Sequence, residues 1–291
     1  MSNTTFGIIL LAHGKRGYGF AAVNMAFSIK QHSPNIPITL FYEDSVLEQV
    51  PEKYLTFIDN IVKLDSEFYE TPSGRVEPGR AKLLAVDKSP YDRTLYLDVD
   101  GLCLKDITPI FDRLKGTPIT CQQMGIGGFG DEDIKYDGWS NHDFTFPFFD
   151  LSPHTIWRTT QTSWFYVEKG TPLLLELFRY YDKRYPLDKL KYQWAGFIPD
   201  EIVWSGVMSK NNVELYGADD IIYFGTDFIQ HTEIVDKYYF LSLYGNGNGV
   251  TLVRPMYFEL YDRILHMDYT KHGLEHQFKC HFIMQDKILS R

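Results

Sequence analysis

The stretch Arg93-Thr94-Leu95-Tyr96-Leu97-Asp98-Val99-Asp100-Gly101-Leu102 decides the fold expected for this 291-residue chain. Its residues 95–97 form a short apolar run with one aromatic, which is typical of a buried strand. The run stops at two carboxylates one residue apart. Side chains at i and i+2 of an extended segment point the same way, so Asp98 and Asp100 can face one point in space. Their mutual repulsion predicts a divalent cation between them, carrying a phosphorylated ligand.

The segments around this strand predict an α/β domain with a largely parallel sheet. A first strand is expected over 6–12, and a glycine-rich basic loop over 13–19 leads into a helix over 20–31. Nucleotide-binding α/β domains begin in this order, although any loop that turns into a helix also needs glycines. Further strands are expected over 36–42, 58–64, 102–104, 119–122, 162–167, 213–216, 221–224 and 264–266, further helices over 80–88, 108–114, 171–181 and 200–208, and an irregular segment over 125–153.

Composition narrows the function classes. The hydrophobic fraction of 44% is ample for a core and excludes a disordered chain. A net charge of −9 counts against a nonspecific grip on nucleic-acid backbone. Cys103, Cys121 and Cys280 lack metal-type spacing and cannot all pair, which predicts a reducing, cytoplasmic location. The apolar run over 6–12 has no basic residue before it and is too short to span a bilayer, so we expect a strand there and no transmembrane segment.

The sequence around Asp98-Val99-Asp100 resembles the GT-A nucleotide-sugar glycosyltransferases, most closely the retaining family 8 group that includes glycogenin and the bacterial lipopolysaccharide galactosyltransferases. The similarity continues from Gly101 to Asp112, which resembles the family's strand after the D-x-D and its following helix. The resemblance implies a GT-A (Rossmann-like) fold, with a mixed, mostly parallel sheet flanked by helices. It further implies a single catalytic domain over 1–235 and a C-terminal segment over 236–291 that completes the metal and diphosphate site.

A set of site residues follows from this resemblance. Asp98, Asp100 and the late His266 would bind the metal, and this oxygen-rich set suits Mn²⁺, with Mg²⁺ as second choice. Tyr18 would stack on uracil, although it could equally be a core aromatic. Contacts to the UDP-sugar donor, the cofactor-type ligand of this family, are expected from Ala12, His13, Tyr18, Arg80, Lys82, Val99, Gln161 and Lys271.

Asp200 and Glu201, which open a predicted helix, resemble the family's Asp-Gln at the reaction centre and are the expected catalytic pair. Glutamate in place of glutamine departs from the family pattern and adds charge beside the anomeric carbon. Asp200 is equally explained as a helix N-cap. Two other positions also depart from the family: Gln161-Thr162-Ser163 stands where the family has Asn-Ser-Gly, and Lys271 lacks the family's neighbouring motifs, so that His272 or Lys279 could replace it.

The predicted function is metal-dependent, retaining transfer of a hexose from a UDP-sugar to a hydroxyl acceptor. Negative charge develops on the leaving diphosphate, and a bound metal would neutralise it. The acceptor could be a glycan, a protein or a hydroxylated nucleobase. The irregular segment over 125–153 is expected to form part of the acceptor wall, with four stacking candidates, Trp139, His142, Phe146 and Phe148.

Two other functions fit parts of the sequence. The stretch over 95–101 also resembles the motif of haloacid-dehalogenase-type phosphohydrolases, in which Asp98 would attack phosphorus and Asp219-Asp220 would be a later Mg²⁺-binding pair. The α/β structure expected before this motif, and Leu102 in place of the usual threonine, count against a phosphohydrolase. A binding protein with a decayed site is the third possibility, and the joint presence of the metal set and Lys82 argues against it.

Overall fold

The computed structural model of the chain describes residues 5–14, 17–48, 50, 52–129, 131, 140–190, 197–224 and 234–242. The described elements follow the chain in this order, with η marking a 3₁₀ helix: β1 (Phe6–Ala12), α1 (Gly17–His32), β2 (Ile38–Tyr42), α2 (Asp44–Leu47), η1 (Glu52–Phe57), β3 (Asn60–Lys63), η2 (Ser66–Phe68), α3 (Pro78–Asp87), β4 (Arg93–Leu97), β5 (Gly101–Cys103), α4 (Thr108–Arg113), β6 (Ile119–Gly127), α5 (His142–Phe148), β7 (Trp157–Glu168), α6 (Pro172–Lys183), η3 (Leu187–Lys189), α7 (Asp200–Lys210), β8 (Ile222–Phe224), α8 (Ile234–Lys237) and β9 (Phe240–Ser242).

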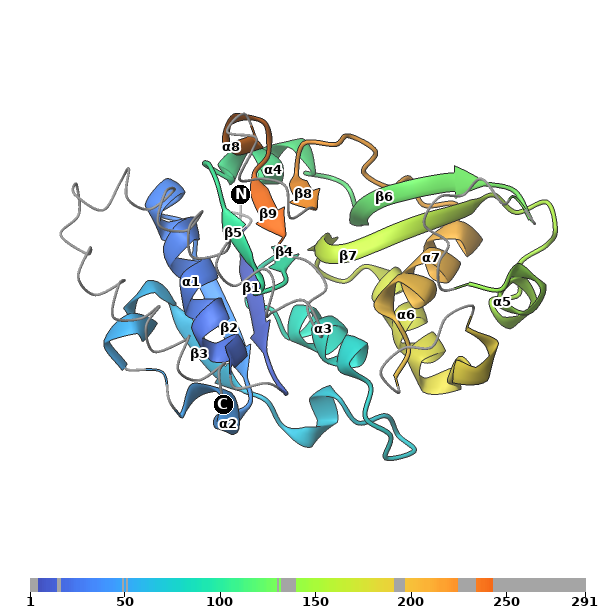
Figure 1. The fold of residues 1–291 in the computed structure, drawn as a ribbon, viewed down its shortest axis with the longest axis horizontal. Helices are drawn as coiled ribbons and strands as arrows, with labels where there is room; N and C mark the ends of the chain where they lie inside the picture. Colours follow the sequence, from blue (N-terminus) through green and yellow to red (C-terminus); the bar gives the residue numbers. More distant parts are fainter. Residues whose placement is uncertain are drawn as a thin grey trace. The chain divides into compact units, whose positions relative to one another are not determined.

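These strands form a six-stranded sheet of order β3-β2-β1-β4-β7-β6 and a three-stranded sheet of order β5-β9-β8 (Figure 1). Strands β2 and β3 are parallel, whereas β7 runs antiparallel to both of its neighbours, β4 and β6. The predicted mixed, mostly parallel sheet with flanking helices is therefore confirmed. No helix among the described residues is long and apolar enough to cross a membrane.

The chain divides into two compact units, and each is described by itself. Unit 1 takes its residues from Met1–Ile9, Leu64–Leu97 and Leu114–Gly217, and unit 2 from Leu10–Lys63, Asp98–Arg113 and Ala218–Arg291. The domain boundary predicted at residue 235 stays a prediction, because most of the segment that follows it lies outside the described residues.

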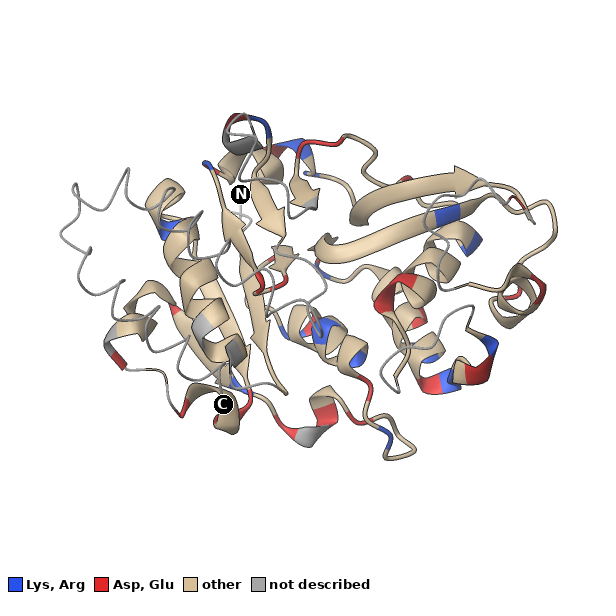
Figure 2. Ribbon diagram, in the orientation of Figure 1, with Lys and Arg blue, Asp and Glu red and all other residues tan. Residues whose placement is uncertain are grey.

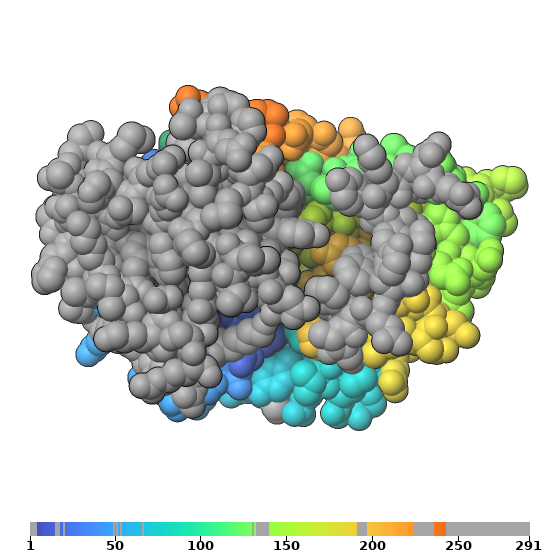
Figure 3. Space-filling view, viewed as in Figure 1, coloured from blue at the N-terminus to red at the C-terminus, as the bar shows by residue number. Residues whose placement is uncertain are grey.

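The core of unit 1 is built from large aromatic side chains between β7 and α7. The ring of Tyr96 stacks on that of Phe165 at a centroid distance of 4.5 Å, and Phe165 lies 4.6 Å from Trp204. Each such ring removes about 150–250 Å² from water, which makes aromatic burial a main source of this unit's stability. Helix α6 packs between α3 and α7. The described surface of unit 1, from β6 through β7 to α6, is coloured green to yellow in Figure 3.

Unit 2 contains the parallel pair β2–β3, helix α1 and the three-stranded sheet. Helix α1 packs on β5, and the Ser28 hydroxyl of α1 accepts a hydrogen bond from the Cys103 amide at 3.0 Å. Strand β5 lies so close to β9 that a Cβ at Gly101 would stand 2.6 Å from the Leu241 carbonyl oxygen. The glycine after the second aspartate is therefore required by backbone packing in this unit.

Several predicted elements differ from the structure, and three of the differences concern α5, residues 213–216 and β6. Helix α5 lies inside the segment expected to be irregular, and Phe146 and Phe148 on it are buried, which removes them as exposed stacking candidates. Tertiary packing of its rings, such as Phe146 on Trp157 at 5.7 Å, forms this helix without a helical apolar period. Residues 213–216 form no strand and make a single bridge, between Tyr216 and Gln122. Strand β6 runs five residues further than predicted, with register shifts near Gly125 of the kind that bulges produce.

Candidate active site

The two aspartates of the D-x-D lie in the short connection between β4 and β5. All five residues of β4 are buried, and so are the three residues of β5. Between the strands, Asp98 and Asp100 are half-buried and Val99 is only 5% exposed. The chain bends at Val99 and Asp100, so it stays a prediction from the i and i+2 spacing that both carboxylates face one point. Their hard oxygen atoms fit a divalent cation such as Mn²⁺ or Mg²⁺.

The loop after β1 lies at the carboxyl end of its strand, where α/β folds place their ligands. Ala12 is fully buried, and its carbonyl accepts a hydrogen bond from the Glu43 amide at 3.0 Å. The Glu43 carboxylate in turn accepts a bond from the Gly14 amide at 2.8 Å. His13 is half-buried in this loop. Tyr18, also half-buried, lies inside the first turn of α1, because this helix begins three residues earlier than predicted.

Unit 1 holds a charged cluster where α3, α6 and α7 meet. The Lys82 ammonium on α3 pairs with the Asp200 Oδ2 atom at 2.8 Å, and their side chains are only 18% and 15% exposed. The Tyr181 hydroxyl on α6 donates to the other carboxylate oxygen, Oδ1, at 3.2 Å. Figure 2 marks the basic positions on α3 and the acidic positions at the start of α7. A lysine and an aspartate that are 118 residues apart in sequence, both predicted site residues, are thus in direct contact.

Asp200 occupies the first turn of α7 rather than its N-cap. The N-cap is Pro199, which makes no side-chain capping bond, and the carboxylate of Asp200 is directed to Lys82 and Tyr181. The helix dipole favours a negative charge at this position. Glu201 follows in the same turn, and its carbonyl accepts a bond from the Thr160 hydroxyl of β7 at 3.2 Å.

Glu201 brings a second acidic group to this region. Burial in the first place, and the negative charge of Glu201 in addition, raise the pKa of the Cys121 thiol on β6. Burial and the charges of Asp200 and Glu201 likewise raise the pKa of Tyr181 well above its usual value, although Lys82 opposes this shift. Tyr181 therefore carries its proton throughout the physiological range and acts as a hydrogen-bond donor.

Two other predicted donor-binding residues of unit 1 make contacts of their own. The Arg80 guanidinium lies 3.5 Å from the Asp182 carboxylate and 5.5 Å from the centre of the Phe178 ring, both on α6. The Gln161 amide on β7 donates to the Ser163 hydroxyl at 2.7 Å and accepts from the Ser163 amide at 2.6 Å. Their roles in donor binding stay predictions.

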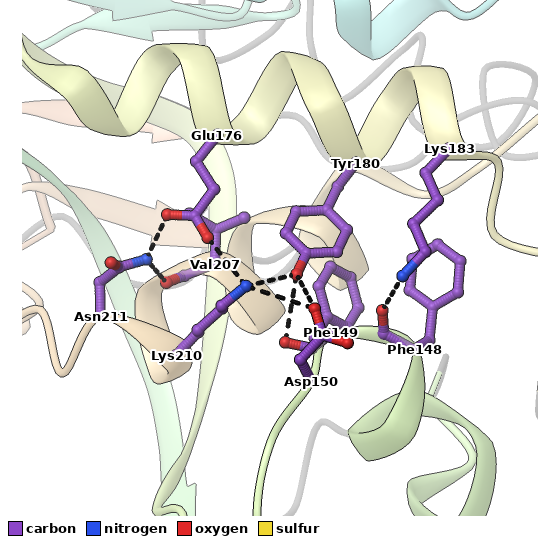
Figure 4. A network of polar contacts seen from close by, with 9 residues as sticks. All are labelled: Phe148, Phe149, Asp150, Glu176, Tyr180, Lys183, Val207, Lys210 and Asn211. Carbon is purple, nitrogen blue, oxygen red and sulfur yellow. Dashed lines mark hydrogen bonds and ion pairs between the residues drawn. The ribbon is translucent and has the colours of Figure 1, made fainter.

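The far end of α7 is held by a polar network with α6 and the segment after α5 (Figure 4). The Lys210 ammonium donates to the Tyr180 hydroxyl at 2.8 Å and lies 3.2 Å from the Glu176 carboxylate and 3.5 Å from that of Asp150. The Tyr180 hydroxyl lies 3.1 Å from the Phe149 carbonyl, to which it can donate. This network fixes α7 against α6 and thereby steadies the helix that carries Asp200.

Several predicted site residues lie outside the described residues: His266, Lys271 and the stacking candidate Trp139. Within the part of the chain that the structure describes, no group of three or more His, Cys, Asp or Glu side chains is arranged to hold a metal ion. The three-ligand metal site with Asp98, Asp100 and His266 stays a prediction.

Sequence reasoning missed Tyr181, Gly79 and Glu43. Tyr181 follows the apolar face of α6 and carries no local sign that its hydroxyl reaches α7. Gly79 lies where α3 approaches that hydroxyl, and a Cβ there would collide with both the Asp200 carboxylate and the Tyr181 hydroxyl. The sequence alone does not indicate this contact. A buried tyrosine on one helix and a glycine in the first turn of another helix are recognised as neighbours only once the packing is known.

Solved structures of glycosyltransferases are similar to this chain. The bifunctional glycosyltransferase WbbM, in its apo form, matches with a TM-score of 0.55 at 13% identity, over 84% of this chain and 47% of WbbM. The galactosyltransferase LgtC, in complex with donor and acceptor sugar analogues, matches with a TM-score of 0.50 at 13% identity, over 82% of this chain and 87% of LgtC. An active-site glutamine-to-glutamate mutant of LgtC matches with a TM-score of 0.51 at 13% identity, over 87% of this chain and 95% of that one.

No protein-family model matches the sequence, and no curated protein matches it. The chain spans about half the length of the WbbM chain that it resembles. The likeness to these structures establishes the fold, which is that of the GT-A glycosyltransferases, as the sequence resemblance implies.

Proposed function

We propose that this chain is a metal-dependent glycosyltransferase that moves a hexose, with retention of configuration, from a UDP-sugar to a hydroxyl acceptor. The contact between Lys82 and Asp200 carries the proposal. A partly buried carboxylate at the start of a helix, paired with a lysine, suits a reaction that develops positive charge on a sugar ring. The glycosyltransferase fold and the D-x-D at the end of β4 support the same reaction.

Most residues on the donor side of the proposal belong to unit 2, while Arg80 and Gln161 belong to unit 1. Asp98 and Asp100 would hold the divalent cation together with His266, and the bound cation supplies neutralisation of the charge on the leaving diphosphate. Ala12, His13 and Tyr18 would receive the nucleoside at the carboxyl end of β1. Val99, Arg80, Gln161 and Lys271 complete the proposed donor contacts.

The residues of unit 1 act on the reacting sugar. When the bond between the anomeric carbon and the phosphate oxygen breaks, its electron pair leaves with UDP and positive charge grows on the sugar. The Asp200 carboxylate, fixed in place before the reaction, stabilises that charge. Glu201 adds a second carboxylate beside it.

The acceptor is a hydroxyl group on a glycan, a protein or a hydroxylated nucleobase. The net charge of −9 favours the first two, because unspecific binding of nucleic acid needs a positive surface. We also propose a cytoplasmic location from the cysteine pattern. The two described cysteines, Cys103 and Cys121, are buried and free.

A pair of assays tests the proposed function. The chain is incubated with a panel of UDP-sugars and Mn²⁺, and separately with a generic phosphate ester and Mg²⁺. Slow release of UDP from one of the sugars, without phosphate release from the ester, is the expected result. Nuclear magnetic resonance of the product then tests retention at the anomeric carbon. Phosphate release from the ester alone would instead support a haloacid-dehalogenase-type phosphohydrolase, and silence in both assays would support a binding protein.

The structure disfavours the phosphohydrolase. Its later acidic pair would be Asp219-Asp220, and both side chains have other partners. Asp220 pairs with Arg113 at 2.6 Å, and Asp219 accepts a hydrogen bond from the Tyr238 hydroxyl at 3.0 Å. Strand β4, which would carry the nucleophile, is the fourth of the described strands rather than the first.

A further inference from the structure

Both oxygens of the Asp200 carboxylate have a partner, but the proposed function gives a role to only one of these partners. Lys82 contacts Oδ2, and the Tyr181 hydroxyl contacts Oδ1. Tyr181 is 0% exposed, so its hydroxyl has no access to bulk water. A fully buried hydroxyl that donates to a carboxylate makes a charge-assisted bond, the stronger class of hydrogen bond in proteins.

Helix α3 is shaped to admit this contact. Gly79 is buried in its first turn, and any Cβ at this position would collide with the Tyr181 hydroxyl and with the Asp200 carboxylate. Lys82 follows three residues later, and side chains at i and i+3 share one face of a helix. One face of α3 therefore provides both the gap for the hydroxyl and the ammonium that binds the other oxygen.

We propose that Tyr181 is a positioning residue of the glycosyl transfer: its buried hydroxyl, in the gap left by Gly79, fixes the orientation of the Asp200 carboxylate. This inference rests on the proposed function. With one oxygen bound to a neutral donor and the other to Lys82, the carboxylate cannot rotate freely about its terminal bond. Electrostatic stabilisation of the positive charge on the sugar depends on such fixed geometry, since a mobile group must be ordered during the reaction.

The competing explanation is that the hydroxyl only stabilises the packing of α6. Tyr185 provides a matched control, because it is also 0% exposed and its hydroxyl lies 2.8 Å from that of Thr145. Tyr181→Phe and Tyr185→Phe each remove one buried hydroxyl and keep the ring. A merely structural role predicts the same effect on catalysis for both variants.

The first experiment measures kcat and the donor KM for UDP release by both variants and the unmodified chain. Loss of a hydrogen bond to a charged group predicts a fall in kcat of about 10- to 100-fold for Tyr181→Phe, with the donor KM changed less than about twofold. Tyr185→Phe should keep its kcat. Equal losses in the two variants, or a change in KM alone, would overturn the proposal.

A second measurement does not need turnover. Urea unfolding of Tyr181→Phe, Asp200→Ala and the double variant gives a double-mutant cycle. If the hydroxyl and the carboxylate are coupled, the midpoint shift of the double variant is smaller than the sum of the single shifts. Additive shifts would overturn the contact itself. A chain that shows coupling but releases UDP from no sugar would overturn the proposed function, and with it the role of Tyr181 in transfer, while the contact stands.

Discussion

Asp200 is the residue on which the proposed chemistry depends, and Lys82 is its closest charged partner. Lys82→Met removes the ammonium and leaves a carboxylate that is only 15% exposed without its counter-charge. We expect a loss of roughly 1–3 kcal/mol of unfolding free energy, because burying the Asp200 carboxylate still costs desolvation free energy after its positively charged partner is removed. UDP release should fall by about 100-fold or more, which is the scale of losing one preorganised electrostatic group.

Lys88 provides the control for this substitution. It caps the same helix and pairs with Glu67, but both side chains are largely exposed, at 43% and 57%. Exposed pairs contribute about 0–1 kcal/mol, so Lys88→Met should leave activity intact and stability nearly unchanged. Equal effects of the two substitutions on turnover would contradict a special role for Lys82. Unfolding in urea and a UDP-release assay provide both readouts.

Gly79 gives a second prediction at this scale. Replacing glycine by alanine inside a helix normally stabilises it by about 1 kcal/mol. At Gly79 the new methyl group would collide with the Tyr181 hydroxyl and the Asp200 carboxylate, so Gly79→Ala should instead destabilise the chain and abolish turnover. Gly128→Ala is the control, since no atom lies within 4 Å of a Cβ at that position. A stable and active Gly79→Ala chain would show that α3 does not approach α6 so closely.

At the scale of elements, the end of α5 is held to α6 and α7 by charge. The Lys183 ammonium in the first place, and Lys210 in addition, hold the pKa of Asp150 below its usual value, although burial opposes this. A lowered pKa means that the folded protein favours the charged form. The stabilisation is therefore complete above the unfolded-state pKa of about 3.9 and is lost as the pH falls through the lower folded-state value.

Asp150→Asn tests this pH dependence. Asparagine tolerates the left-handed backbone at this position, where φ is 58°, so the substitution removes the charge without adding strain. The urea midpoints of the two chains should differ near neutral pH and converge below about pH 4. A difference that stays constant across the titration would exclude charge as its cause.

The elements that sequence predicts best are those with a local pattern. The apolar period of α6, with Leu174 and Leu177 buried on one face, and the short apolar run of β4 require no knowledge of the rest of the chain. Helix α5 could not be found in this way. It is held by aromatic contacts to distant residues, such as Phe144 with Tyr185 at 5.3 Å, and these contacts leave no period in its sequence.

At the scale of the whole molecule, ligand binding should raise stability only when the metal site is intact. A ligand at about a hundredfold excess over its Kd adds roughly 2.7 kcal/mol to the unfolding free energy. UDP with Mn²⁺ should therefore raise the Tm by several degrees, and a chelator should remove that shift. Asp100→Asn should abolish both the shift and turnover. A shift that persists in this variant would remove the D-x-D from the mechanism.

The same distinction between local and distant signals applies to the candidate site. Asp98 and Asp100 stand out because motif, strand and bend are contiguous in sequence. Asp200 can be predicted from the sequence as the start of a helix, but its contacts with Lys82 and Tyr181 cannot. These contacts depend on how α3, α6 and α7 pack against one another. That packing follows from tertiary contacts, which a single sequence does not display.

Among the described residues, Cys103 and Cys121 give each unit one buried free thiol. Burial raises the pKa of both, so neither is a reactive thiolate in the folded protein. Modification by an aromatic disulfide reagent then requires local opening, and its rate reports the opening equilibrium of each unit once Cys280 is replaced by serine. A nucleotide sugar that tightens one unit would slow modification of that unit's thiol alone. The modification rates of the two thiols thus report which unit a ligand stabilises.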